Sequence, residues 1–256
     1  MPTLEVHQFP CLQDNYGVLI HDVEAGVTAS IDAPEAAAVR RALAEKGWNL
    51  THILTTHHHG DHTAGNLELK RETGCTIVGP AGEARKVPGI DTAVKGGDTF
   101  QFGGHEVRVI DTPGHTAGHI AYWIPDAALA FVGDTLFAMG CGRVLEGDYE
   151  TMWSSLERLM ELPPATRLYC GHEYTVANAR FALSIEPDNT ELQQRARESE
   201  ALRAAGRPTL PTRLDLELAT NPFLRAGAAS VRESLGMLEA PDWEVFAEIR
   251  ERKNRS

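Results

Sequence analysis

Thr-His-His-His-Gly-Asp-His, at residues 56–62, is the stretch that indicates the fold most strongly. Strand-like residues at 53–56 come before it, so the histidines follow the end of a predicted strand. His57 and His59 are two residues apart and point to the same side of an extended backbone. Imidazole and carboxylate are the usual protein ligands of Zn²⁺ and similar ions. The stretch therefore predicts a metal site, and Asp61 and His62 can face a second ion where the chain turns into a helix.

Three other predicted strands end in the same way. Residues 107–111 lead to His115, residues 166–170 lead to His172, and the apolar residues 128–133 end at Asp134. Each of these strands is followed by glycine and a ligand-type side chain. The first stretch alone is also compatible with an exposed polar turn or an accidental metal-binding tract. Four strand ends that deliver His or Asp to one edge of a sheet favour a metal site instead.

Four motifs, taken in chain order, resemble the metallo-β-lactamase fold superfamily: T-H-H-H-G-D-H, T-P-G-H-T-A-G-H, G-D-T-L-F and Y-C-G-H-E-Y. Within it, G-C-G-R at 140–143, G-H-E-Y-T at 171–175, N-P-F-L-R at 221–225 and the basic C-terminus resemble the glyoxalase II (hydroxyacylglutathione hydrolase) family. The resemblance runs from about Val6 to Lys253. It implies an α/β fold, an αββα sandwich followed by a smaller all-helical C-terminal domain.

The resemblance also implies two divalent metal ions, with zinc as the first expectation and iron or manganese as compatible alternatives. The implied ligands are His57, His59 and His115 for the first ion, Asp61, His62 and His172 for the second, and Asp134 for both. Two carboxylates reduce the repulsion between two dications. Ions roughly 3.5–4 Å apart can share one hydroxide and lower its pKa towards neutrality. Asp61 and Asp134 are therefore the expected catalytic residues, Asp61 as the group that orients the hydroxide.

The implied reaction is hydrolysis of the thioester S-D-lactoylglutathione to D-lactate and glutathione, the second step of methylglyoxal detoxification. A thiol has a pKa of about 8.5, so a thiolate leaves with metal help and little general acid. No candidate acid stands out near the motifs, which favours a thioester over an amide.

The resemblance places the substrate-binding residues at Arg143, Tyr174, Arg250 and Lys253. Arg250 and Lys253 are three apart on the last predicted helix, so they share a face and can grip a carboxylate. Stabilisation of a helix C-terminus against its dipole is the alternative. Leu145 stands where family members usually have an aromatic residue, so one glutathione contact is expected to be missing.

Three further residues near the motifs have open roles. His58 lies between two ligands on the alternate face and is expected to support or pack against the site. His119 follows His115 by four residues and is expected to support its loop. Asp32 ends a strand, where it either orients a ligand histidine by a hydrogen bond or is a plain turn carboxylate.

Composition limits the partners. The 256 residues carry a net charge of −12, which would repel nucleic acid. Residues 173–256 hold 12 Lys and Arg against 14 Asp and Glu, a charge of −2, so the acidic excess lies in the part with the metal motifs. No stretch is apolar enough for a membrane span, and the N-terminus lacks the features of a signal peptide. We therefore expect a cytoplasmic monomer that binds a small molecule, with its four cysteines as free thiols.

The order of the predicted elements gives the domain organisation. Residues 4–32 read as a β meander, followed by helices at 34–46, 63–73 and 149–162. Further strands are predicted at 51–56, 75–79, 99–103, 105–111, 118–124, 128–133 and 166–170. After His172 the helical segments are 174–186, 188–205, 228–238 and 242–253. This change predicts a catalytic domain of residues 1–172 and a helical substrate-binding domain of residues 173–256.

Other functions share parts of this pattern. A mononuclear iron persulfide dioxygenase of the same fold would keep His57, His59 and Asp134 but would not need the second set of ligands. A metallo-β-lactamase is expected to carry a signal peptide and to lack the glutathione-type tail. A non-catalytic metal-binding or nucleic-acid-processing protein is disfavoured by the acidic charge when nucleic acid is the partner. The complete second set and the long helical tail favour the thioester hydrolase.

Overall fold

A computed structural model describes residues 3–256, whose contacts divide the chain into two compact units. The first unit contains the chain as far as Asp111 together with Thr116–Gly133. The second contains Thr112–His115 and Asp134–Ser256. These units group neighbouring residues by contact, and the domain boundary expected at 172/173 stays a prediction.

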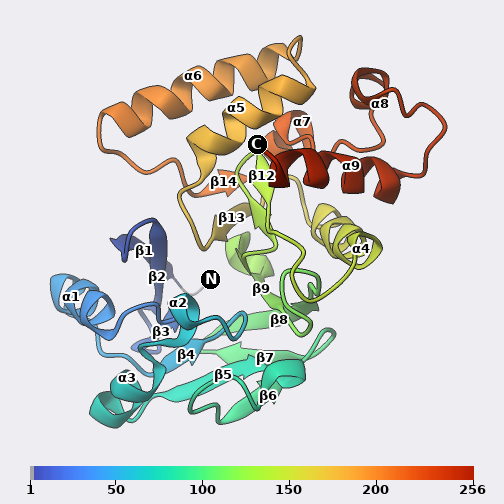
Figure 1. The fold of residues 1–256 in the computed structure, drawn as a ribbon. Helices are drawn as coiled ribbons and strands as arrows, with labels where there is room; N and C mark the ends of the chain where they lie inside the picture. Colours follow the sequence, from blue (N-terminus) through green and yellow to red (C-terminus); the bar gives the residue numbers. More distant parts are fainter. Residues whose placement is uncertain (1–2) are drawn as a thin grey trace. The chain divides into compact units, whose positions relative to one another are not determined.

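A six-stranded sheet in the first unit follows the order of the sequence (Figure 1). Its strands are β1 (Leu4–Cys11), β2 (Asn15–Asp22), β3 (Val27–Ile31), β4 (His52–Leu54), β5 (Thr76–Pro80) and β6 (Thr92–Val94). The pairs from β1 to β3 are antiparallel, whereas those from β3 to β6 are parallel. The parallel strands therefore end at a common edge, as the metal-site prediction requires.

Helices α1 (Ala36–Lys46) and α3 (Asn66–Thr73) pack against this sheet (Figure 1). Val39 and Leu43 of α1 share a core with Leu69 of α3 and with the strand residues Ile53 and Ile77. The apolar residues of α1 recur three and four apart, which places them on one face of the helix. As predicted, α1 ends before a glycine, and Gly47 has the left-handed conformation that favours glycine at that position.

A second, antiparallel sheet of the first unit faces the first sheet. Its strands are β7 (Thr99–Phe102), β8 (His105–Asp111), β9 (Ile120–Ile124) and β10 (Leu129–Gly133). The buried Tyr122 hydroxyl of β9 donates to the Thr55 carbonyl beside β4 at 2.7 Å. The edge of the Phe102 ring in β7 meets the ring of His52 in β4. The first unit therefore contains one helical layer and two sheet layers, which is part of the expected αββα sandwich.

The second unit consists mainly of helices (Figure 1). Its helices are α4 (Tyr149–Met160), α5 (Thr175–Ile185), α6 (Thr190–Ala204), α7 (Leu214–Thr220), α8 (Ala229–Leu235) and α9 (Asp242–Asn254). Four short strands form two pairs: β11 (Leu136–Phe137) with β12 (Gly140–Cys141), and β13 (Arg167–Cys170) with β14 (Thr212–Arg213). Contacts among Trp153, Phe181, Phe223 and Phe246 join α4, α5 and α9 to the segment after α7.

Two helical segments differ from the sequence prediction. The helix expected at 63–73 is divided into α2 (Gly60–Thr63) and α3, because the chain at Gly65 passes close to the start of α1. A Cβ at Gly65 would lie 2.8 Å from the backbone nitrogen of Ala36. Helix α7 lies between the helical segments predicted at 188–205 and 228–238, where no helix was expected. Among the described residues, none of the helices has the length and apolar character that crossing a membrane requires.

Candidate metal centre and substrate site

The parallel strands of the first unit bring three polar groups to one edge. Asp32 directly follows β3, Thr56 lies two residues after β4, and Glu83 lies in a short helical turn directly after β5. All three are almost completely buried. Buried carboxylates need hydrogen-bond partners to offset the loss of solvation, and the histidine loop supplies those partners for both acids.

Asp32 orients two of the predicted metal ligands. Its carboxylate accepts hydrogen bonds from the Thr56 backbone at 2.7 Å, the Thr56 hydroxyl at 2.9 Å and His62 Nδ1 at 2.8 Å. The Thr56 hydroxyl, which donates to Asp32, also contacts His57 Nδ1 at 3.0 Å. Both rings therefore use Nδ1–H as a donor, which orients Nε2 as the candidate metal-binding nitrogen. Asp32 has a φ of 55°, a conformation that costs energy for a residue other than glycine.

His57 and His59 meet the geometric requirement for one metal ion. His57 Nε2 lies 3.1 Å from His59 Nδ1. Zn–N bonds of about 2.0–2.1 Å in a tetrahedral site place two ligand nitrogens roughly 3.3 Å apart, so the two rings fit a shared ion. Asp61 lies 3.8 Å from His62 Nε2, and Asn15 donates to its carboxylate at 3.2 Å. The loop thus brings two pairs of candidate ligand atoms together, and their assignment to two ions stays a prediction.

The buried Glu83 supports the same loop and was not identified from the sequence. One carboxylate oxygen accepts hydrogen bonds from the backbone and ring of His58, both at 2.8 Å. The other accepts from the Gly118 backbone at 2.9 Å. His119 is fully buried and stacks on the His57 ring at 4.8 Å. His58 and His119 therefore make the supporting contacts that their positions suggested.

Asp134 lies between two histidines of the second unit. Its Oδ2 atom is 3.5 Å from His115 Nε2 and 3.2 Å from His172 Nε2. His115 Nδ1 donates to the Arg143 carbonyl at 3.0 Å, so Nε2 is again the candidate ligand nitrogen. One carboxylate oxygen that faces both ring nitrogens is the arrangement expected of a bridging ligand.

Aromatic contacts hold His172 in place. Tyr174 stacks on the His172 ring with a centroid distance of 4.8 Å and an angle of 2° between the planes. Phe137 contacts both rings edge-on. Tyr174 keeps 37% of its surface exposed, so one face supports a ligand while the rest can contact substrate.

Helix α9 presents its basic residues in two ways. Arg252 and Arg255 form ion pairs with Glu248 and Glu251 on their own helix. Arg250 and Lys253 instead lie 5.2 Å from the rings of Phe223 and Phe181, respectively. Burial and the neighbouring Arg250 lower the pKa of Lys253. The predicted common face of Arg250 and Lys253 is present.

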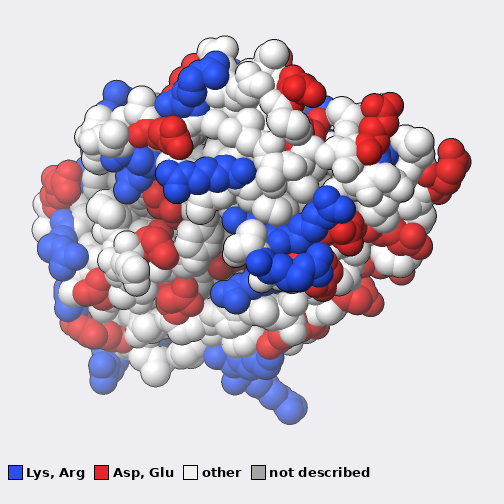
Figure 2. All heavy atoms as spheres, turned by 45° about the horizontal axis from the view of Figure 1, so that its top comes forward, with Lys and Arg blue, Asp and Glu red and all other residues white. Residues whose placement is uncertain are grey.

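Lysine and arginine side chains gather near the middle of the face that Figure 2 shows, with carboxylates around them. Arg143 is exposed, whereas Arg250 is only 4% exposed. Arg250 donates through Nη1 to the Cys141 carbonyl at 2.9 Å and through Nε to the Asn254 side chain at 3.1 Å. The guanidinium donors of Arg250 that could bind a substrate carboxylate in bidentate fashion are therefore engaged in hydrogen bonds within the protein. The exposed Leu145 provides no aromatic ring for a glutathione contact.

The cysteines are not catalytic candidates. All four are buried free thiols. Burial raises the pKa of Cys141 to about 11, against the opposing effect of Arg250, and burial also raises the pKa of Cys170. At neutral pH both remain neutral thiols, as expected of small buried hydrophobic residues.

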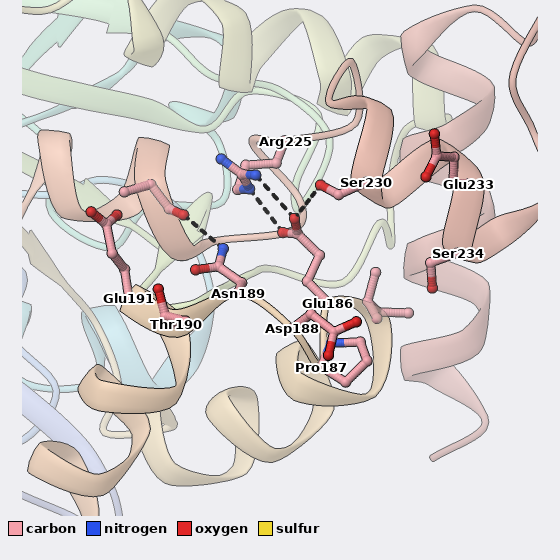
Figure 3. Close-up of a pocket in the computed structure, with 12 residues that line it drawn as sticks. Glu186, Pro187, Asp188, Asn189, Thr190, Glu191, Arg225, Ser230, Glu233 and Ser234 are labelled. Atoms are coloured by element: carbon pink, nitrogen blue, oxygen red, sulfur yellow. Dashed lines mark hydrogen bonds and ion pairs between the residues drawn. The ribbon is translucent and has the colours of Figure 1, made fainter.

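A hollow of the second unit is lined by other residues than these. It has a volume of about 780 Å³ and is lined by residues of the second unit between α5 and α8, including Glu186 and Arg225 (Figure 3). None of the predicted site residues lines it. The candidate site therefore rests on the chemistry of its side chains and not on the size of a cavity.

Comparison with known proteins identifies the family of the chain. Residues 23–172 match the family model of the metallo-beta-lactamase superfamily, which defines the class of protein. Residues 173–256 match the model of the hydroxyacylglutathione hydrolase C-terminus. The chain belongs to the hydroxyacylglutathione hydrolase family. The predicted fold class and the family resemblance are both confirmed.

Similar proteins include the hydroxyacylglutathione hydrolases of Brucella ovis and Brucella abortus. Each is 59% identical over 251 residues, which cover 98% of both chains. Among solved structures, ETHE1 from Myxococcus xanthus is 26% identical with a TM-score of 0.65, and the match covers 97% of each chain. The BLEG-1 B3 metallo-beta-lactamase is 20% identical with a TM-score of 0.64, over 86% of this chain and 99% of the other. That similarity supports the fold alone.

Proposed function

We propose that the chain hydrolyses the thioester bond of S-2-hydroxyacylglutathiones, with S-D-lactoylglutathione as the principal substrate. D-lactate and glutathione are the products, as in the second step of methylglyoxal detoxification. One observation carries the proposal. The region that matches the hydroxyacylglutathione hydrolase C-terminus lies in the same compact unit as His115, Asp134 and His172, and its Tyr174 stacks on His172.

The proposed cofactor is a pair of divalent metal ions, with zinc preferred over iron and manganese. The first ion is assigned to His57, His59 and His115, the second to Asp61, His62 and His172, and Asp134 is assigned to both. Within each unit the donor atoms fit this assignment, through the His57–His59 spacing and the position of Asp134 Oδ2. When bound, such ions activate water at neutral pH and polarise a carbonyl group.

The protein's own groups position the reactants. The Asp61 carboxylate, held by Asn15, accepts a hydrogen bond from the attacking water and directs it at the thioester carbonyl carbon. Asp134 keeps His115 and His172 at fixed distances from its carboxylate. The sulfur departs as a thiolate, because a thiol pKa of about 8.5 allows it to leave without a proton donor.

The substrate-binding residues are proposed to be Arg143, Tyr174, Arg250 and Lys253. Lys253 lies against the ring of Phe181 and is only partly exposed, so a glutathione carboxylate would meet it in a site with little water. Arg250 adds positive charge from its buried position. With four buried thiols and a net charge of −12, we expect the enzyme to be a cytoplasmic monomer that does not bind nucleic acid.

The proposal is tested by measuring turnover of S-D-lactoylglutathione and of a β-lactam at equal concentrations, with metal analysis of the same sample. We expect two ions per chain, thioester turnover and negligible lactam cleavage. Asp134→Ala should reduce both metal content and kcat/KM, the latter about 10²-fold or more. Faster turnover of the lactam, or full thioesterase activity with one ion per chain, would contradict the assignment.

A further inference from the structure

A tight hairpin separates two parts of the candidate metal centre. It consists of β11, β12 and the two-residue turn Ala138–Met139 between them. Asp134 lies two residues before β11. Arg143, whose carbonyl receives the hydrogen bond from His115, lies two residues after β12. The conformation of the hairpin therefore fixes the distance between a bridging carboxylate and the group that orients a histidine ligand.

Side chains from the helices hold this hairpin by its backbone. Asn221, which follows α7, donates to the carbonyls of Phe137 at 3.2 Å and Gly140 at 3.0 Å. Glu217 of α7 accepts from the Met139 backbone N–H at 2.8 Å.

Two other helices complete these contacts. Asn178 of α5 donates to the Ala138 carbonyl at 3.1 Å. Arg250 of α9 donates to the Cys141 carbonyl. Every residue from Phe137 to Cys141 thus has a backbone group bonded to a side chain of the helical region.

The hairpin has a conformation that needs such support. Met139 is fully buried and has a φ of 54°, which is unfavourable for a residue other than glycine. Its side chain packs into the core formed by Ala179, Ala182 and Leu192 of α5 and α6. At Gly140 a Cβ would lie 2.4 Å from the Asn178 amide nitrogen, so the close approach of Asn178 requires glycine.

Both ends of the hairpin touch the candidate metal centre directly. The Gly142 N–H donates to the Thr135 carbonyl at 3.2 Å, next to Asp134. A Cβ at Gly142 would lie 1.9 Å from the Asp134 carbonyl oxygen and 3.3 Å from His115 Nδ1. A displacement of the hairpin would therefore move Asp134 and the Arg143 carbonyl together.

The orientation of the Asn221 side chain is set by its own helix end. Asn221 Oδ1 accepts a hydrogen bond from the Phe223 backbone N–H at 3.1 Å, which turns Nδ2 towards the hairpin. Nδ2 also donates to the Glu217 carboxylate at 3.0 Å. Glu217 is fully buried and is held in turn by Arg195 and Thr212. The N-P-F segment of the chain is thus part of a rigid polar network that ends on the hairpin backbone.

We propose that Asn178, Glu217 and Asn221 are positioning residues of the metal centre, which act through the hairpin on Asp134 and on the carbonyl that orients His115. This inference rests on the proposed metal-dependent function. The helical region then has a second role besides substrate binding, because its side chains set the geometry of the metal ligands. Mutation of a residue that supports metal ligands typically lowers metal affinity about 10- to 100-fold.

A matched pair of buried carboxylates tests the proposal. Glu217 and Glu186 are both buried, and each binds an arginine and a hydroxyl group. Figure 3 shows the Glu186 contacts with Arg225 and Ser230, none of which includes the hairpin. Glu217→Gln and Glu186→Gln therefore remove the same charge from similar surroundings, but only Glu217→Gln disturbs the hairpin.

The measurement is competition of the metal-free protein with a chromophoric chelator for Zn²⁺, together with the visible spectrum of the Co²⁺ form. Both Gln variants should unfold at lower temperature. Only Glu217→Gln should bind Zn²⁺ about 10- to 100-fold more weakly and show an altered Co²⁺ spectrum. Asn178→Ala, which removes one hydrogen bond to the hairpin, should also lower metal affinity. It provides the test if Glu217→Gln does not fold.

The two possible failures are distinct. Wild-type affinity and an unchanged Co²⁺ spectrum in Asn178→Ala and Glu217→Gln would overturn the positioning role. Failure of the wild-type chain itself to bind two ions would instead overturn the proposed function.

Discussion

Asp32 combines three functions that a single carboxylate rarely serves together. Its carboxylate accepts one hydrogen bond from the His62 ring and two from Thr56. The Thr56 hydroxyl in turn contacts His57 Nδ1 and so orients the His57 ring. It therefore orients a proposed ligand of each metal ion. Its left-handed backbone conformation is sustained by these bonds.

Replacement of Asp32 by asparagine tests this role with almost no change in shape. The asparagine side chain keeps one oxygen that accepts hydrogen bonds. Its NH₂ group replaces the other oxygen and would face the N–H and O–H donors of His62 and Thr56, with which it cannot form hydrogen bonds. The rings must then change tautomer or orientation, so Zn²⁺ affinity should fall about 10- to 100-fold. Competition titration of the metal-free protein measures this. An Asp32→Asn protein that binds Zn²⁺ as tightly as the wild type would show that Asp32 is only a turn carboxylate.

Candidate metal ligands are easier to identify in the sequence than the groups that support them. The seven proposed ligands follow strand ends in compact motifs, so their residue types and spacing are visible directly. Glu83 and Asn15 have no such motif, because their function depends on partners 25 to 46 residues away. Only the folded structure brings these partners together.

At the level of secondary structure, long and strongly patterned segments were predicted well, and short ones were not. Helix α7 has seven residues near prolines and was missed, as were β11 and β12, which have two residues each. The turn at Met139 carries no glycine signal, since its conformation is maintained by Glu217 and not by local preference. Side-chain hydrogen bonds from residues 40 to 109 positions away hold the backbone of β11 and β12.

Helix α9 allows the binding and anchoring roles of its basic residues to be separated. Lys253→Ala should raise KM about 5- to 150-fold with kcat within a few-fold, since a bond to a charged group contributes roughly 1–3 kcal/mol in both ground and transition states. Arg250→Ala should raise KM and also lower the unfolding temperature, because it removes the bond to the Cys141 carbonyl.

Steady-state kinetics and thermal unfolding of both variants check this division. Arg252→Ala is the control, because Arg252 pairs with Glu248 on the surface of the same helix and should change neither quantity appreciably. An unchanged KM in Lys253→Ala would contradict the substrate assignment and leave stabilisation of the helix C-terminus as the function of that residue.

For the molecule as a whole, the proposed metal ions are expected to contribute to the free energy of unfolding. The chain carries a net charge of −12, and two of the proposed metal ligands, Asp61 and Asp134, are carboxylates. Metal ions that bind only the folded protein stabilise it by mass action, by about 4 kcal/mol when their free concentration is 1,000 times Kd. For a chain of this size, that corresponds to an increase of roughly 8–16 °C in unfolding temperature.

Chelation should therefore lower the unfolding temperature by about that amount, and added Zn²⁺ should restore it. Removal of the metal should lower local stability near the proposed ligands as well as the global unfolding temperature. Hydrogen exchange should rise first in residues 57–62 and in Thr112–His115, which carry proposed ligands on loops and not within strands or long helices. Asp134→Ala provides the internal control, since a protein that no longer holds the ions should respond little to the chelator. Equal unfolding temperatures for the wild type with and without chelator would show that these clustered carboxylates and imidazoles are stable without metal, and the proposed ligand assignment would be wrong.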